Sequence, residues 1–267
     1  MSARGPAARR RILVTGGGSG IGLAIARRLG RGGDHVVLAS RSRERLEEAR
    51  ETLADEGCSC SVHVCNVRDP EAVAGLFTAL GRLDGLVNNA AGNFVCPSLE
   101  LSPNGFRAVV ETSLHGAFYC SQGYARQAIA CDIPGAIVNL VATYAWTGAP
   151  GVAHSAAAKA GLVALTKTLA REWGPHRIRV NGLAPGFVPT ESARAALLSD
   201  PDADQRMLDL IPLGRFGLPD EVAAAAEWLL SDEASYCTGA ILTADGGRSL
   251  GVQLHAAVAT PQDAGPR

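Results

Sequence analysis

The sequence has no long uninterrupted apolar run, since none approaches the roughly 18 residues that a membrane-spanning helix needs. Its first residues, MSARGPAARRR, lack the apolar core of a secretory signal, and its last residues are not the peroxisomal signal SKL. An excess of one charge is also missing, because 25 basic and 26 acidic residues leave a net charge of −1. We therefore expect no membrane or nucleic-acid partner, and a cytoplasmic location.

Disulfide and metal patterns are absent as well. The seven cysteines are odd in number and lie mostly within apolar runs, which favours free thiols in a reducing compartment. Cys58, Cys60 and Cys65 lack both the spacing and the nearby second pair of ligands of a zinc site. We expect no metal centre.

Short β-branched apolar runs alternate with longer segments of helical period along the whole chain. Strands are predicted at 11–15, 35–40, 61–66, 84–89, 135–142, 178–184 and 240–245, and helices near 20–31, 42–56, 70–81, 102–131, 152–174, 191–209 and 219–231. This order predicts an α/β protein with a single-domain Rossmann fold: a doubly wound, parallel, seven-stranded sheet with helices on both faces. Ligands of such sheets bind beyond the carboxyl ends of the strands.

One domain over residues 11–250 accounts for this pattern, and 47% apolar residues can supply its core. The segments 1–10 and 251–267 have no periodicity and are predicted to be flexible tails. The charged, Ala- and Asp-rich segment 190–212 is predicted to be a substrate flap, with a plain surface helix as the alternative.

A glycine-rich turn, TGGGSGIG at 15–22, follows the first predicted strand and opens the first predicted helix. Glycines allow a tight turn and a close approach to a pyrophosphate, and the helix N-terminus offers amide donors. The predicted cofactor contacts here are Gly16, Gly18, Ser19, Gly20, Ile21 and Gly22.

The end of the second predicted strand points to NADPH. An acidic residue there would bind the ribose 2′-hydroxyl of NAD, but the chain has Ser40 and Arg41, which can meet a 2′-phosphate. The alternative is that Arg41 only begins a solvated helix. Asn66 and Val67, after the third predicted strand, are predicted to hold the adenine edge.

Five motifs in order, TGGGSGIG, NNAAG at 88–92, the helix of Lys159, RVNGLAPG at 179–186 and TGAILTADGG at 238–247, resemble those of the short-chain dehydrogenase/reductase family. The resemblance covers roughly residues 10–250. It implies that Asn88, Asn89 and Ala90 line the adenosine side and that Lys159 binds the nicotinamide ribose. It also implies that Pro185, Gly186, Val188 and Thr190 frame the carboxamide.

The catalytic tetrad of that family, Asn-Ser-Tyr-Lys, is almost entirely missing. Its tyrosine position holds Ser155, its serine position Ala142 and its asparagine position Ser113, so that only Lys159 remains. An aliphatic hydroxyl is a much weaker acid than a phenol, whose pKa is about 10. Ordinary ketone reduction is therefore disfavoured.

A phenol elsewhere offers different chemistry. Tyr144 follows the fifth predicted strand, and this displaced tyrosine, with Asn93 in NNAAGNF, SPNGF at 102–106 and a serine four residues before the lysine, resembles the 2,4-dienoyl-CoA reductases of the family. The resemblance implies NADPH-dependent reduction of a carbon–carbon double bond in an acyl thioester. Tyr144 as an ordinary loop aromatic and Asn93 as a turn residue are the alternatives.

Hydride addition to a double bond conjugated with a thioester places negative charge on the thioester oxygen, which needs hydrogen-bond donors. Tyr144 and Asn93 are the predicted donors, Ser155 is predicted to hold the substrate or Lys159, and Phe94 and Trp146 are predicted to line an acyl pocket. Phe94 and Trp146 as plain core aromatics remain an alternative.

Other readings stay open. A simple 2-enoyl thioester is an alternative substrate, and a non-catalytic NADPH-binding sensor or scaffold is an alternative of another class. His154 beside Ser155 suggests a hydrolase only weakly, because adjacent helical side chains diverge by about 100°.

Candidate contacts of a coenzyme A handle are Arg177, Arg179, Arg215 and Arg248. The helix 152–174 has a small-residue face that would let another helix approach closely. The family resemblance implies that this face forms a two-fold interface, and hence a homodimer or a D₂ tetramer.

Overall fold

The computed structural model describes residues 9–191, 193 and 203–251. Most of the two predicted tails and much of the predicted flap therefore lie outside the described residues. Arg10 is a correction to the predicted tail, because its guanidinium pairs with Asp34 at 2.7 Å and also bonds the carbonyl of Leu230. The ordered fold thus begins before the first strand.

A single parallel sheet of seven strands forms the middle layer, in the order β3-β2-β1-β4-β5-β6-β7. The predicted fold class is confirmed. The strands are β1 Arg11–Thr15, β2 His35–Ser40, β3 Ser59–Val64, β4 Gly85–Asn88, β5 Gly135–Leu140, β6 Ile178–Pro185 and β7 Ile241–Ala244. After β3 the chain adds further strands on the other side of β1, so that the strand order reverses between β1 and β4. Ligands bind such sheets at this point.

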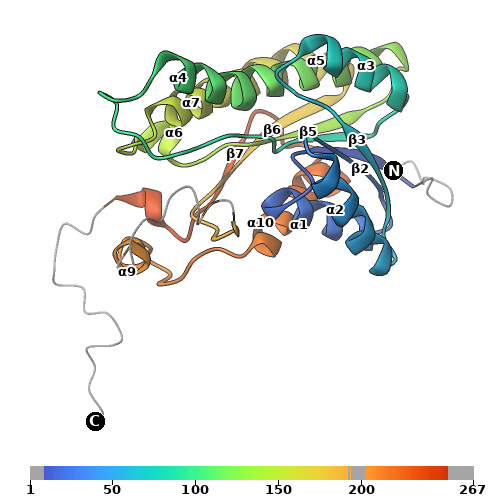
Figure 1. Ribbon diagram of the computed structural model, residues 1–267. Coiled ribbons are helices and arrows are strands. Elements are labelled where there is room, and N and C mark those ends of the chain that lie inside the picture. The colour runs from blue at the N-terminus through green and yellow to red at the C-terminus, as the bar shows by residue number, and fades with distance from the viewer. Residues whose placement is uncertain (1–8, 192, 194–202, 252–267) are drawn as a thin grey trace.

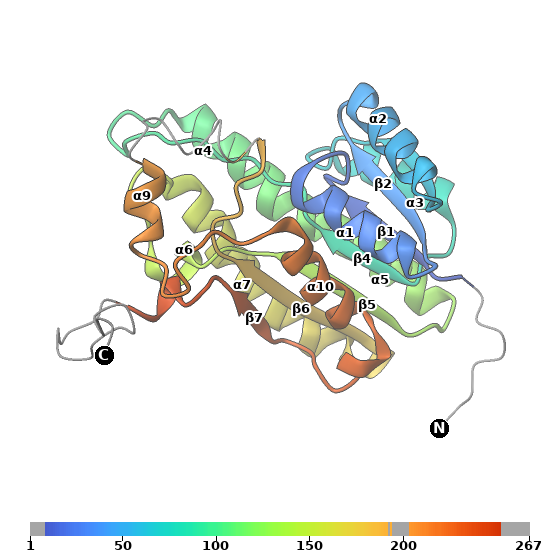
Figure 2. The same ribbon diagram turned by 90° about the horizontal axis from the view of Figure 1, so that it is seen from below.

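Helices cover both faces of the sheet (Figures 1 and 2). One face carries α1 Gly20–Arg31, α2 Arg43–Asp55 and α10 Pro219–Leu230, and the other carries α3 Pro70–Leu80, α5 Gly116–Ala130 and α7 Ala153–Trp173. The other helices among the described residues are α4 Pro103–Val110, α6 Tyr144–Thr147 and α9 Ala203–Leu208, with short 3₁₀ turns at Gly174–His176, Asp232–Ala234 and Arg248–Leu250. Figure 1 shows α4, α6 and α9 at one end of the sheet, where the strands end.

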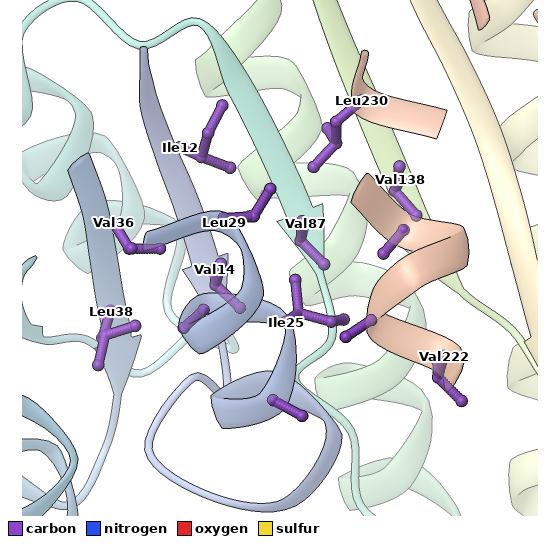
Figure 3. Close-up of a cluster of buried hydrophobic side chains, with 14 of the residues drawn as sticks. Ile12, Val14, Ile25, Leu29, Val36, Leu38, Val87, Val138, Val222 and Leu230 are labelled. Atoms are coloured by element: carbon purple, nitrogen blue, oxygen red, sulfur yellow. The ribbon is translucent and has the colours of Figure 1, made fainter. Parts of the chain in front are cut away.

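Two apolar cores hold these layers together. Figure 3 shows the first, in which Ile25 and Leu29 of α1 and Val222 and Leu230 of α10 pack on strand side chains. Both faces of the central strands are covered, so their sequences read as continuous apolar runs rather than as alternating ones. The labelled strand residues of this core are Ile12, Val14, Val36, Leu38, Val87 and Val138.

Several element boundaries differ from the prediction by one or two residues, and the helical segments differ in two further ways. β3 spans Ser59–Val64 rather than 61–66, because its pairing with β2 stops where Ser40 meets Val64. The helix expected over 102–131 runs without a gap from Pro103 to Ala130, but it contains a π turn at Glu111–His115 between α4 and α5. The second helical difference is the short helix α6, which lies where no helix was predicted and which begins at Tyr144.

Candidate active site

The glycine-rich turn lies between the end of β1 and the start of α1. Gly16 has a φ of +65°, which disfavours a side chain, and a Cβ on Gly22 would lie 2.3 Å from the carbonyl oxygen of Gly16. Ser19 precedes α1 without a side-chain capping bond. No side chain of the described residues caps the first backbone N–H groups of α1, so they are free to donate to a ligand such as a pyrophosphate. Gly18, Gly20 and Ile21 belong to the same turn.

The residues that follow β4 hold the glycine-rich turn by hydrogen bonds. The amide group of Asn89 donates to the carbonyl oxygens of Thr15 and Gly16, both at 3.1 Å. The hydroxyl oxygen of Thr15 accepts the backbone N–H groups of Asn89 and Ala90, again at 3.1 Å. Asn89 thus shapes the turn directly, and Thr15 is a supporting residue that the sequence analysis missed.

Asn88 has a different environment from the one that the resemblance implied. Asn88 is only 4% exposed. Its side-chain amide donates to the Ser121 hydroxyl and to the Asn139 side-chain oxygen, both at 2.8 Å. Asn139 in turn donates to Thr166 on α7 at 2.9 Å. The Asn88 side chain therefore joins the sheet to α5 and α7 instead of lining the adenosine side.

The corner next to the glycine turn holds the residues predicted to bind the adenosine. Ser40 is half-buried and Arg41 is exposed, and Arg41 makes no ion pair with any described residue. Asn66 is exposed, whereas the side chain of Val67 packs against Gly116, where a Cβ would lie 2.7 Å from it. A free guanidinium at this corner fits an additional phosphate.

The loop after β6 returns to the glycine turn. Pro185 ends β6, the backbone N–H of Gly186 bonds Ala244 at 2.9 Å, and Val188 is buried. A Cβ on Gly20 would lie 3.1 Å from the methyl group of Thr190. These residues, distant in sequence, therefore close one side of the same site.

Lys159 lies in the second turn of α7 and reaches the end of β5. Its ammonium group donates to the carbonyl oxygen of Leu140, and the residue is almost fully buried. Burial without a paired anion lowers the pKa of Lys159 to about 8. An anionic ligand nearby would favour the charged form.

Tyr144 and Ser155 form the central contact of the site. The phenol oxygen of Tyr144 lies 3.0 Å from the hydroxyl oxygen of Ser155, which is 1% exposed. Burial raises the pKa of Tyr144, and the hydrogen bond with Ser155 only partly opposes this shift. The phenol therefore stays protonated at neutral pH and can donate. Lys159 follows Ser155 by one helical turn, so that both lie on one face of α7.

Asn93 lies on the loop between β4 and α4. Its side-chain oxygen accepts the backbone N–H of Phe94 at 3.0 Å, which leaves the amide NH₂ to donate elsewhere. The loop is tied down at Gly92, whose N–H bonds the Ser113 hydroxyl at 3.4 Å, and at Cys96, whose N–H bonds Gly151 at 2.8 Å. Ser113 thus has a role, missed from the sequence, in anchoring this loop.

The two predicted acyl-pocket aromatics are both on the surface. Phe94 is 37% and Trp146 is 47% exposed, so neither is a plain core aromatic. Phe94 contacts the ring of His154 edge to face, with centroids 4.4 Å apart. The sequence analysis did not foresee this contact, because Phe94 and His154 are far apart in the chain.

Two of the arginines considered for a coenzyme A handle lie at the wrong edge of the sheet. Arg177 pairs with Asp132 at 2.6 Å, and Arg179 bonds the carbonyls of Leu229 and Ser231. Both precede or begin β6, whereas the site lies where β6 ends. Arg215 is paired with Glu221, and Arg248 lies past the end of β7.

The described residues contain no group of three or more His, Cys, Asp or Glu side chains arranged to hold a metal ion. None of their helices is long and apolar enough to cross a membrane.

Comparison with known proteins adds independent information. A family model described as "Enoyl-(Acyl carrier protein) reductase" matches residues 16–249. A Bacillus subtilis protein named "Probable 2,4-dienoyl-CoA reductase" ((2E)-enoyl-CoA-producing) is 44% identical over 247 residues, which cover 91% of this chain and 97% of that protein. The peroxisomal 2,4-dienoyl-CoA reductase ((3E)-enoyl-CoA-producing) of Pongo abelii is 44% identical over 89% of this chain and 82% of that protein.

A solved structure agrees with these matches. The gluconate 5-dehydrogenase of Burkholderia cenocepacia J2315, in complex with NADP and tartrate, superposes with a TM-score of 0.86 at 33% identity and covers 91% of this chain and 96% of that one. Sequence motifs, strand order, family model and relatives agree, and the chain belongs to the short-chain dehydrogenase/reductase family.

Proposed function

We propose that the protein reduces a carbon–carbon double bond in an unsaturated acyl thioester with NADPH, as a 2,4-dienoyl-CoA reductase does. The observation that carries this proposal is the 3.0 Å contact between the Tyr144 phenol and Ser155, one helical turn before Lys159. A phenol is thereby available near the lysine although the family's tyrosine position holds a serine. When bound, the reduced nicotinamide supplies the hydride.

The donors of the site suit an enolate better than an alkoxide. Tyr144 keeps its proton at neutral pH, and Asn93 has an amide NH₂ that none of the described residues accepts. Two such donors can stabilise charge on a thioester oxygen without transferring a proton to it. A carbon of the resulting enolate then takes its proton from water, so that Tyr144 and Asn93 both keep their protons.

Ser155 and Lys159 support this pair. The buried Ser155 hydroxyl fixes the direction of the Tyr144 phenol, and Lys159, held by the carbonyl of Leu140, is in a position to bind the nicotinamide ribose. Phe94, on the loop after β4, and Trp146, in α6 after β5, are exposed rings and are proposed to contact the acyl chain. These roles explain why Lys159 is retained without the rest of the tetrad.

NADPH is proposed over NADH because Arg41 is exposed and unpaired among the described residues, while Ser40 beside it carries a hydroxyl. The glycine turn supports either cofactor. The solved relative with bound NADP supports the same choice.

Two relatives support the substrate class, since both are named as 2,4-dienoyl-CoA reductases. Other relatives in the family are named as dehydrogenases, including the gluconate enzyme above. The absence of the family's serine and asparagine from positions 142 and 113 argues against alcohol chemistry here.

The test is direct. Purified protein is incubated with NADPH and either a 2,4-dienoyl-CoA or a 2-enoyl-CoA, and NADPH consumption and products are followed. Consumption with the dienoyl substrate supports the proposal, and faster consumption with the simple enoyl substrate favours an enoyl-CoA reductase. NADPH binding without turnover of any thioester or ketone would favour a sensor or scaffold.

The assembly is proposed to be a homodimer or D₂ tetramer. The outward positions Ala157 and Ala160 of α7 are small and exposed, which would let a helix of a second copy approach closely. Light scattering of the purified protein tests this proposal.

A further inference from the structure

His154 is a buried histidine that the proposed reaction does not use. It is 0% exposed at the start of α7, and its Nδ1 accepts the backbone N–H of Ser155 at 2.9 Å. A nitrogen that accepts a hydrogen bond carries no proton, so His154 is neutral with its proton on Nε2. That Nε2–H is buried and has no oxygen or nitrogen partner among the described residues. A buried donor of this kind requires an explanation.

The ring of Phe94 supplies one. The planes of the Phe94 and His154 rings meet at 86°, and the ring centroids are 4.4 Å apart, close to the short end of the range for edge-to-face pairs. The face of an aromatic ring is electron-rich and accepts an N–H donor. Phe94 itself is 37% exposed, and its ring also neighbours Gly105 of α4, where a Cβ would lie 3.2 Å from the tip of the Phe94 ring.

We propose that His154 is a positioning residue whose Nε2–H donates to the face of Phe94 and so fixes the loop residue that orients Asn93. The backbone N–H of Phe94 bonds the side-chain oxygen of Asn93 at 3.0 Å. Holding Phe94 therefore holds the direction of the Asn93 amide. The catalytic part of this inference rests on the proposed function.

The position of His154 also connects the two proposed donors. Its Nδ1 accepts from Ser155, whose hydroxyl contacts Tyr144, while its ring contacts Phe94, which bonds Asn93. The loop backbone is bonded to other segments on either side of Phe94, at Gly92 and at Cys96, but, among the described residues, not at Phe94 itself. Loss of the His154 contact should therefore let the backbone around Phe94, and with it the Asn93 side chain, shift without unfolding the loop.

The first experiment observes the proton itself and needs no substrate. In protein labelled with ¹⁵N at histidine, NMR should show His154 as the Nε2–H tautomer, with its proton shifted upfield by the Phe94 ring. The Phe94→Leu variant, altered at an exposed position, should keep the tautomer and lose the upfield shift. A proton on Nδ1, or a shift that is the same in both proteins, would overturn the proposal.

The second experiment measures the coupling by kinetics on the dienoyl thioester. His154→Leu and Phe94→Leu should each lower kcat about tenfold, and the double variant should be no worse than the more impaired single variant. NADPH affinity should stay the same, and His154→Gln, which retains an N–H donor, should recover part of kcat. Losses that multiply in the double variant would refute action through Phe94.

A matched control separates positioning from general weakening of the helix. Leu169 is buried near the opposite end of α7 from His154, in the core under α3 and α5, so Leu169→Ala should lower thermal stability and leave kcat unchanged. If wild-type protein turns over no thioester, the proposed function fails, and the NMR comparison alone decides the role of His154.

Discussion

The proposed cofactor end and the proposed substrate end of this site are built in different ways. The cofactor end consists mainly of backbone from one short stretch, 15–22, held by Thr15 and Asn89. The substrate end consists of side chains that three separate segments contribute, namely Asn93, Tyr144 and the pair Ser155 and Lys159. Backbone geometry depends on the local sequence, whereas side-chain geometry depends on how distant segments pack.

The two ends also differ in the substitutions that they tolerate. A single methyl group on Gly22 would lie 2.3 Å from a backbone oxygen, and the turn could not keep its shape. At the substrate end, Ser113 and Ser155 occupy two of the family's tetrad positions, and the fold accommodates both: each hydroxyl makes a hydrogen bond. A family with a constant cofactor end can therefore change its chemistry at the other end.

The largest effect on activity is expected at the substrate end, when the Tyr144 phenol is removed. Tyr144→Phe removes one oxyanion donor, so kcat on the dienoyl thioester should fall by roughly 10²–10³, while NADPH affinity stays nearly unchanged. Steady-state kinetics and fluorescence titration with NADPH measure these quantities. Tyr236→Phe, at a fully exposed position, is the control and should behave as wild type. A fully active Tyr144→Phe would remove the phenol from the mechanism.

An intermediate effect is expected at the cofactor end. Arg41→Asp should weaken NADPH relative to NADH by about 10- to 100-fold, because a charge-assisted contact to the 2′-phosphate becomes a repulsion. Kd values for both cofactors check this change. Arg43→Asp, at an exposed position on the same connection, is the matched control and should change the ratio much less. An unaltered preference in Arg41→Asp would mean that the phosphate is bound elsewhere.

The smallest effect concerns Lys159, which lies where the two ends meet. Burial lowers its pKa to about 8, so the ammonium cation is present below that pH and lost above it. NADPH is anionic, and its Kd should therefore rise a few-fold between about pH 7 and pH 9. Binding measurements across this range test the expectation. Lys159→Met cannot titrate and should show a flatter profile; an equally steep profile in that variant would assign the effect to another group.

Much of the fold could be predicted because the pattern is repeated along the chain. The strands were located to within two residues, since most contain a run such as ILV at 12–14 that is apolar throughout and is bounded by polar or glycine-rich turns. The π turn within the helix over 102–131 could not be predicted. It lies where Val67 packs on Gly116 and Ser113 reaches Gly92, and both partners come from other parts of the chain.

The candidate site was predicted unevenly for the same reason. The sequence located the glycine turn as a unit, but it assigned Asn88 to the cofactor, whereas the buried side chain bonds Ser121 and Asn139. The roles of Thr15 and His154 were missed, because each depends on a partner brought close only by folding.

The sequence by itself determined the alternation of strands and helices, the parallel sheet, the glycine turn and the loss of the tetrad's phenol, because these follow from local residue patterns. Only the tertiary structure decided that Tyr144 contacts Ser155, that Phe94 lies against His154 and that Asn88 faces the core. Each of these contacts joins residues from separate elements, and the packing of helices on the sheet sets their distance.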